Sequence, residues 1–159
     1  MTTTHLPGLG GRIAIRVYGV PIPQGSKRVG RHGKRPVILD NNDQVLAPWR
    51  AHVRATAEDV CRYHDIVTGP VRTWVRFTFT RPPSHFLTDG VRLRAGAPQF
   101  PGHGCGDVDK LLRAVLDAIT GVAIHDDTQV VDVRARKFYA GENEHALDQA
   151  GVDIILEEI

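Results

Sequence analysis

Alternation of apolar and polar residues predicts four strands along the chain. Near the start, Ile13, Ile15 and Val17 share one face while arginines occupy the other. A longer alternation follows residue 70, with valines and phenylalanines on one side and Arg72, Trp74 and Arg76 on the other. The predicted strands cover residues 12–18, 71–80, 128–139 and 151–158.

Apolar residues at helical spacing predict two helices. The first covers residues 48–66, with Pro48 in its first turn. Its buried face is predicted to contain Trp49, Val53, Ala57, Val60 and His64. The second covers residues 107–120 and ends at Gly121, a residue typical of helix C-termini. Its apolar stripe consists of Leu111, Leu112, Val115, Leu116 and Ile119.

The resulting order, β-α-β-α-β-β, predicts an α+β fold in which two helices pack on one mixed sheet. We expect residues 1–159 to form a single domain with a frayed segment at 1–11. The prolines and glycines of VPIPQGSKRVGRHGKR, residues 20–35, argue against regular structure there. Residues 81–106 form a predicted long loop, and loops of that length are usually functional or mobile.

Composition is that of a globular domain, with 42% hydrophobic and 24% charged residues. No apolar run is long enough to span a bilayer, and the first residues lack the pattern of a signal peptide. Cys61 and Cys105 stand alone in the sequence, which argues against a disulfide framework. A cytoplasmic protein with no membrane partner is therefore expected.

Charge is distributed unevenly along the chain. Residues 1–100 carry 15 Lys and Arg against 6 Asp and Glu, whereas residues 101–159 carry 5 against 12. A fold that joins these halves places a basic surface around an acidic patch, as polyanion-binding proteins require. The alternative is an unevenly charged surface in contact with solvent only. The candidate DNA-binding residues are Lys27, Arg28, Arg31, Lys34, Arg35, Arg92 and Arg94.

Four aspartates flank the second predicted helix. Asp107 and Asp109 lie in its first turn, where a cap role is a strong alternative. Asp126 and Asp127 precede a strand, where a turn role is equally open. The helix advances roughly 17 Å, and seven extended residues reach roughly 23 Å. Residues 121–125 can therefore run back along the helix, and we expect the four carboxylates to form one cluster.

Such a cluster needs a cation, because neighbouring carboxylates resist joint ionisation. Oxygen ligands suit Mg²⁺, which leaves coordination positions open for a phosphate and supports phosphodiester hydrolysis. Lys110 or Arg113 can then offset the charge that develops on the phosphate. Zinc is the competing metal, since histidines and cysteines lie nearby, but their spacing matches no standard zinc site.

Two stretches resemble the RusA-type endodeoxyribonucleases, Holliday-junction resolvases often encoded by phages and prophages. GDVDKLLRAVLDAITGVAIHDDTQVV matches the family pattern of D-x-D, a helix, and D-D-x-Q before a strand. VYGVPIPQGSKR matches the pattern found near the start of many members. The resemblance covers residues 12–138 and implies a RusA-like fold.

Transferred position by position, the resemblance implies metal-binding and catalytic roles for Asp107, Asp109 and Asp127. Asp126 becomes an accessory ligand. The family's lysine one turn beyond the second acid falls on Arg113, and Lys110 stands where asparagine is common. The resemblance also implies Mg²⁺ or Mn²⁺ dependence and a homodimer that makes paired nicks in a four-way DNA junction.

Three hypotheses therefore follow from the sequence. The first is a metal-dependent endonuclease acting on four-way (Holliday) junctions in DNA recombination and repair. The second is a nuclease of the same fold acting on other branched DNA, such as forks or flaps. The third is a non-catalytic DNA-binding accessory protein whose acids only cap helices and form turns.

Overall fold

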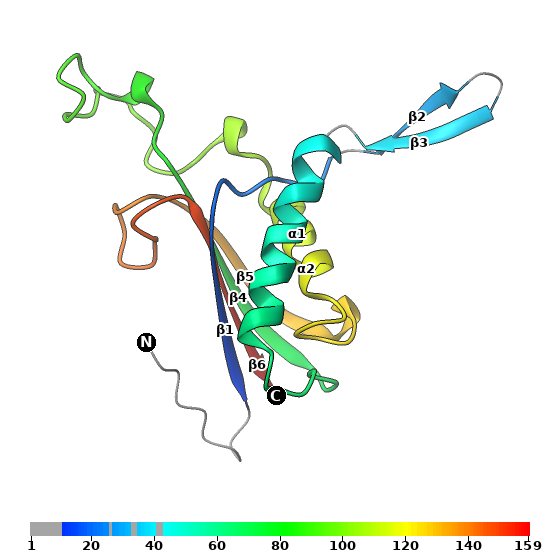
Figure 1. Cartoon of the computed structure of the whole chain (residues 1–159). Coiled ribbons are helices and arrows are strands. Elements are labelled where there is room, and N and C mark those ends of the chain that lie inside the picture. Colours follow the sequence, from blue (N-terminus) through cyan, green and yellow to red (C-terminus); the bar gives the residue numbers. More distant parts are fainter. Residues whose placement is uncertain (1–10, 26, 33–34, 41–42) are drawn as a thin grey trace.

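A four-stranded sheet with two helices on one face forms the body of the protein (Figure 1). The computed structural model describes residues 11–159 except 26, 33–34 and 41–42, and no side chain from 26 to 43. Fraying was predicted for residues 1–11, and residues 1–10 lie outside the described residues. The elements are β1 (Arg12–Tyr18), β2 (Lys27–His32), β3 (Arg35–Asp40), α1 (Asp43–Val60), β4 (Val71–Phe79), α2 (Val108–Ile119), β5 (Val130–Tyr139) and β6 (Gly151–Glu158).

The sheet order is β1-β6-β4-β5. β6 pairs antiparallel with both β1 and β4, whereas β4 and β5 pair parallel. The parallel pair requires a crossover, and α2 lies within that connection. As a result, α2 runs opposite to β4 and β5, and its C-terminal end meets the start of β5. The predicted α+β class, with two helices packed on a mixed sheet, is confirmed.

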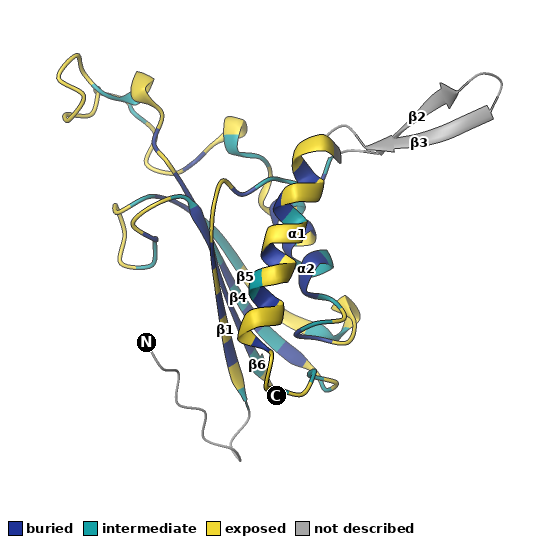
Figure 2. Ribbon diagram, in the orientation of Figure 1, coloured by how far each residue is buried: buried dark blue, intermediate teal, exposed yellow. Residues whose placement is uncertain are grey.

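The core lies between the helices and one face of the sheet. Val71, Val75 and Phe77 of β4 are fully buried, as their alternation predicted. Trp49 and Val53 of α1 pack into the same cluster, together with the apolar stripe of α2. No helix from the described part of the chain covers the other face of the sheet, where the β4 side chains are partly exposed (Figure 2).

The prediction that residues 20–35 lack regular structure is wrong for their second half. β2 and β3 form an antiparallel hairpin, with Lys27 paired to Asp40 and His32 paired to Arg35. This two-stranded sheet stands apart from the main sheet (Figure 1). Its sequence signal is Gly33-Lys34, a two-residue connection with glycine first, which is typical of hairpins.

The predicted limits of the first helix are also wrong, because α1 begins five residues before Pro48 and ends at Val60. Leu46 is only 2% exposed, so the buried face extends to the N-terminal side of the proline. At the other end Cys61 is buried while Val60 is exposed, and the chain then turns. No helix in the described part of the chain is long and apolar enough to cross a membrane.

The long loop, residues 81–106, is anchored by Arg81. Its guanidinium donates to both carboxylate oxygens of Glu142, at 2.6 Å each, and to the Pro98 carbonyl at 2.8 Å. It also lies over the Tyr139 ring, 3.9 Å from the centroid. The hydrogen bond from Arg81 lowers the pKa of Glu142. Two short 3-10 helices, Pro83–His85 and His103–Cys105, give the loop further local order.

Candidate functional site

Asp107 occupies the N-cap position of α2 but does not act as a cap. Its backbone is extended, at φ −76° and ψ 143°, yet its side chain makes no cap hydrogen bond. The carboxylate lies 3.3 Å from the Lys110 ammonium and is 64% exposed. Asp107 therefore stands at the helix N-cap, as the capping alternative predicted, but its side chain does not make the cap hydrogen bond. The carboxylate is open to a ligand from solvent.

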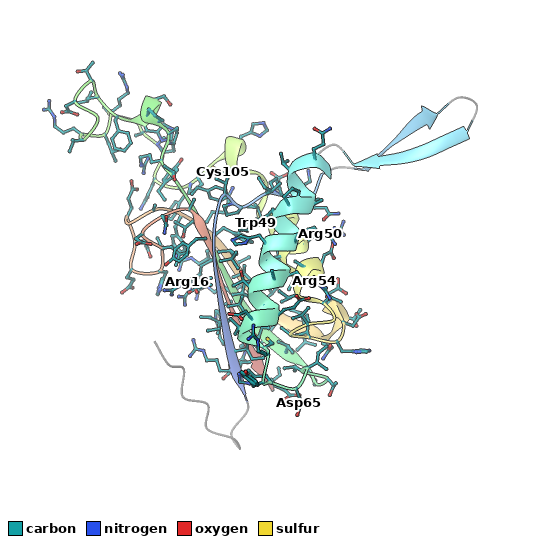
Figure 3. All side chains as sticks on the ribbon, in the orientation of Figure 1. Arg16, Trp49, Arg50, Arg54, Asp65 and Cys105 are labelled. Atoms are coloured by element: carbon teal, nitrogen blue, oxygen red, sulfur yellow. The ribbon has the colours of Figure 1, made fainter. Side chains whose placement is uncertain are left out.

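The polar face of α2 divides into an open part and an occupied part. Asp109 and Arg113 are exposed, and neither forms an ion pair with the described residues. Asp117, two turns beyond Asp109, instead faces Arg50 of α1 at 3.6 Å; Figure 3 labels that arginine. The open carboxylates thus gather at the N-terminal end of the helix.

Two segments distant in sequence fix this end of α2. The backbone amide of Gln24 donates to the Lys110 carbonyl at 3.0 Å, and the Lys137 ammonium donates to the Gly106 carbonyl at 2.9 Å. Gly106 has φ +82°, and a Cβ there would lie 2.6 Å from Pro23. Glycine is therefore required where the N-terminal segment packs against the start of the helix.

Gln24 and Lys137 are the residues that sequence reasoning missed. The Gln24 side chain is buried, and its Oε1 has no hydrogen-bond partner among the described residues. Lys137 pairs across strands with the buried Phe77, so it points toward the helix layer. Its signal was a charged residue at an inward position of a predicted strand. The Gln24 signal was the PIPQG motif, to which no role had been given.

Asp126 and Gln129 have structural roles at the other end of α2. Asp126 caps the 3-10 helix Asp127–Gln129 and accepts from the Thr128 amide at 2.9 Å. Hydrogen bonding from Thr128 lowers the pKa of Asp126. Gln129 completes a capping box and also donates to the Val67 and Gly69 carbonyls, at 3.0 and 2.8 Å. The alternative of a turn role is therefore correct for Asp126, whereas Asp127 is exposed.

The predicted cluster of four carboxylates does not form within one chain. Residues 120–125 fold into a compact turn in which the Gly121 amide donates to the Ile124 carbonyl at 2.8 Å. The His125 amide donates to the Val67 carbonyl at 3.1 Å, which holds the segment beside the start of β4. The estimated reach was an upper limit for an extended chain. Burial of Ala123 and Ile124, at 1% and 0% exposure, favours the turn instead.

The acids consequently form two separate groups. α2 has 12 residues, so about 18 Å of helix lies between Asp107 and the turn that leads to Asp127. Among the described residues, no three histidine, cysteine or acidic side chains gather in a metal-binding arrangement. The histidines and cysteines considered for zinc therefore do not form a site there either. The Asp107–Asp109 pair alone suits Mg²⁺, which often takes one or two carboxylates and completes its shell with water and phosphate.

The basic candidates are only partly described. Lys34 and the side chains of Lys27, Arg28, Arg31 and Arg35 lie outside the described residues. In the long loop, the Arg92 guanidinium is bound to Asp89 at 2.6 Å. Arg94 is exposed. The role of these residues in DNA binding stays a prediction.

Comparison with known proteins gives a family match over most of the chain. A family model described as endodeoxyribonuclease RusA matches residues 19–147. The chain is also 30% identical over 131 residues to the uncharacterized protein YqaN of Bacillus subtilis (strain 168), covering 82% of this chain and 89% of that protein. The family match includes Gln24, Lys137 and both acidic groups.

Proposed function

This chain belongs to the RusA endodeoxyribonuclease family, and we propose that it is a metal-dependent homodimer that resolves four-way DNA junctions by paired nicks. The observation that carries the proposal is the Asp107 carboxylate, which makes no cap hydrogen bond at a helix end held by Gln24 and Lys137. A helix terminus fixed from two sides keeps its carboxylates in place for a ligand.

Asp107 and Asp109 are the proposed ligands of Mg²⁺, with Mn²⁺ as a substitute. When bound, the metal supplies an activated water and polarises the phosphodiester. Lys110 holds Asp107 in position through their ion pair, and Arg113 lies exposed one turn further along the helix. A guanidinium there presents a fork of donors to phosphate oxygens.

Asp127 requires a separate explanation, because about 18 Å of helix lies between Asp107 and the turn that leads to Asp127. We assign its contribution to the neighbouring copy in the homodimer, whose Asp127 completes the site begun by Asp107 and Asp109. Asp126 then acts indirectly, since its hydrogen bond to Thr128 fixes the short helix that carries Asp127. The separation of the two acidic groups within one chain supports this arrangement, which requires a homodimer to complete each site.

The test is cleavage of a four-way junction, a fork, a flap and a linear duplex in Mg²⁺, in Mn²⁺ and in EDTA. We expect paired nicks in the four-way junction with either metal and none in EDTA. Asp107→Asn should abolish nicking, while Asp117→Asn is the matched control because that carboxylate contacts Arg50.

Other outcomes separate the competing functions. Preferred cutting of forks or flaps would replace the junction with another branched substrate. Binding of branched DNA without cleavage in either metal would favour the accessory protein. Full activity of Asp107→Asn would refute the proposed site.

A further inference from the structure

The face of the sheet opposite the helices carries a dense set of arginines. Neighbouring strands place their outward side chains in rows, because the register aligns them across the sheet. One row joins β1, β6, β4 and β5 through Arg16, Asp153, Arg76 and Arg136. The charged residues of this open face are Arg12, Arg16, Arg72, Arg76, Arg134, Arg136, Asp132, Asp153 and Glu157.

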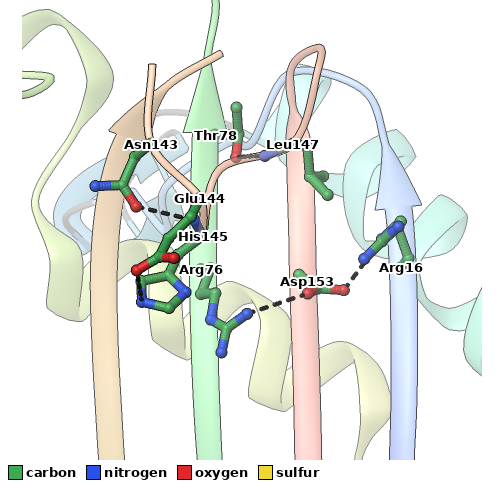
Figure 4. A network of polar contacts seen from close by, with 8 residues as sticks. All are labelled: Arg16, Arg76, Thr78, Asn143, Glu144, His145, Leu147 and Asp153. Atoms are coloured by element: carbon green, nitrogen blue, oxygen red, sulfur yellow. Dashed lines mark hydrogen bonds and ion pairs between the residues drawn. The ribbon is translucent and has the colours of Figure 1, made fainter. Parts of the chain in front are cut away.

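Six arginines against three acids give this open face a net charge of +3. Asp153 contacts both Arg16, at 3.2 Å, and Arg76, at 3.8 Å (Figure 4). Asp132 and Glu157 both contact Arg72, at 2.8 and 3.8 Å.

All three acids therefore form ion pairs with Arg16, Arg72 or Arg76. Arg12, Arg134 and Arg136 form no ion pair with any residue in the described ranges. Two of these three lie on the edge strand β5. That edge of the open face therefore holds more arginines without an ion pair than any other strand of the sheet.

A recess of about 120 Å³ lies at this edge, lined by Trp74, Arg76, Arg134, Arg136 and His145. A recess of this volume is large enough to admit a phosphate group. The loop carrying His145 is fixed to the sheet, because the Leu147 amide donates to the Thr78 hydroxyl at 3.0 Å (Figure 4). Glu144 contacts His145 at 3.6 Å and directly precedes this lining residue in the sequence.

An aromatic ring completes the recess. Trp74 is partly exposed, and the guanidinium groups of Arg12 and Arg72 each lie 5.9 Å from its ring centroid. An indole surrounded by cations binds aromatic anions through stacking and charge together. Nucleotides in a single strand have both properties, whereas bases within a duplex are stacked on one another.

We propose that the open face binds a single-stranded segment of the DNA substrate, with a base on Trp74 and phosphates at Arg134 and Arg136. The proposal rests on the proposed function, since it adds a second contact surface for the same substrate. A symmetric copy of this chain fits less well, because a two-fold interface would bring together two faces that each carry a net charge of +3. β5 joins the two surfaces, with Lys137 on its helix side and Arg136 on its open side.

Tryptophan fluorescence tests the proposal directly. The chain has two tryptophans, and Trp49 is in the core at 5% exposure. In a Trp49→Phe background, adding a twelve-residue oligothymidine in EDTA should quench Trp74 emission. If Trp49→Phe does not fold, anisotropy of a labelled oligothymidine with the unaltered chain gives the same affinity.

Arg134→Gln with Arg136→Gln should weaken this binding by about tenfold or more and reduce the salt slope by about 1.4, for two lost phosphate contacts. The matched control is Arg54→Gln with Arg62→Gln, which removes two exposed arginines, one on α1 and one in the turn after it, and should change neither value. No quenching, or an unchanged slope in the first double variant, would overturn the proposal.

Two further outcomes separate this surface from the nuclease site. Junction cleavage without oligothymidine binding would overturn this proposal alone, whereas binding without cleavage in any metal would overturn the proposed function. If the Arg134/Arg136 variant instead dissociates the homodimer in sedimentation and binds oligothymidine normally, a second copy covers the face.

Discussion

The two ends of α2 carry the same residue type in opposite structural situations. At the N-terminal end, Asp107 stands in a cap position without making the cap hydrogen bond. At the C-terminal end, Asp126 makes its cap bond and belongs to a capping box with Gln129. Both aspartates are exposed, but Asp126 accepts a hydrogen bond from the Thr128 amide, whereas Asp107, the proposed metal ligand, makes no cap hydrogen bond. Bonding, and not residue type, distinguishes a candidate site residue here.

The largest predicted effect tests whether the two ends belong to one site. Asp109→Asn and Asp127→Asn should each lower nicking by more than about a hundredfold, since even residues behind a metal ligand cost 10–100-fold. Mixing the two variants should restore about a quarter of the sites. About half of the dimers are then mixed, and each mixed dimer has one site with both Asp109 and the partner copy's Asp127 intact. The product should be single nicks, measured on a supercoiled cruciform plasmid.

The mixture has a clear control and a clear contradiction. Each variant alone, refolded in the same way, should stay inactive. An inactive mixture, with mixed dimers verified by differently tagged chains, would show that each site draws its acids from one chain.

An intermediate effect is expected from breaking the structural end. Gln129→Ala removes the capping box and leaves the Val67 and Gly69 carbonyls without this donor. The free energy of unfolding should fall by about 1–3 kcal/mol, measured by urea denaturation. The exposed Gln149→Ala is the matched control and should change stability by less than about 0.5 kcal/mol. Equal losses in both variants would contradict the role of Gln129.

The smallest effect should come from the charge of Asp126. Asp126→Asn keeps an acceptor at the cap but removes the carboxylate, so the difference in stability reports the charge. Because folding lowers the pKa of Asp126 below 3.8, its charge stabilises the protein at neutral pH. That contribution is lost as pH falls through the lowered pKa. Urea denaturation from pH 7 to 3 should show the two proteins converging, and a constant difference would contradict this account.

The sequence predicted the four strands of the main sheet and α2 closely because their signals are local. β1 and β6 match their predicted limits, and Gly121 ends α2 with φ +78° as expected. The beginning of α1 was missed, because burial of Leu46 outweighs the tendency of Pro48 to stand in a first turn. A single proline near a helix start is a weaker limit than an apolar face.

The candidate site was harder to predict, since it depends on contacts between distant segments. The acids themselves were identified from spacing and resemblance. Their grouping was wrong, because the length of an extended segment sets only the farthest point it can reach. Burial of Ile124 beside Val67 decided where the segment actually runs. Similarly, nothing local indicates that Lys137 binds the Gly106 carbonyl.

The parallel pairing of β4 with β5 has a consequence for how the protein folds. Val71–Phe79 and Val130–Tyr139 pair across a connection of fifty residues, 80–129, which includes the long loop and α2. Closing a connection of that length is entropically costly, and such non-local pairings slow folding. The Lys137–Gly106 contact forms only when β5 has docked. A chain that has not completed its sheet therefore lacks one of the two contacts that hold the start of α2, where the proposed site lies.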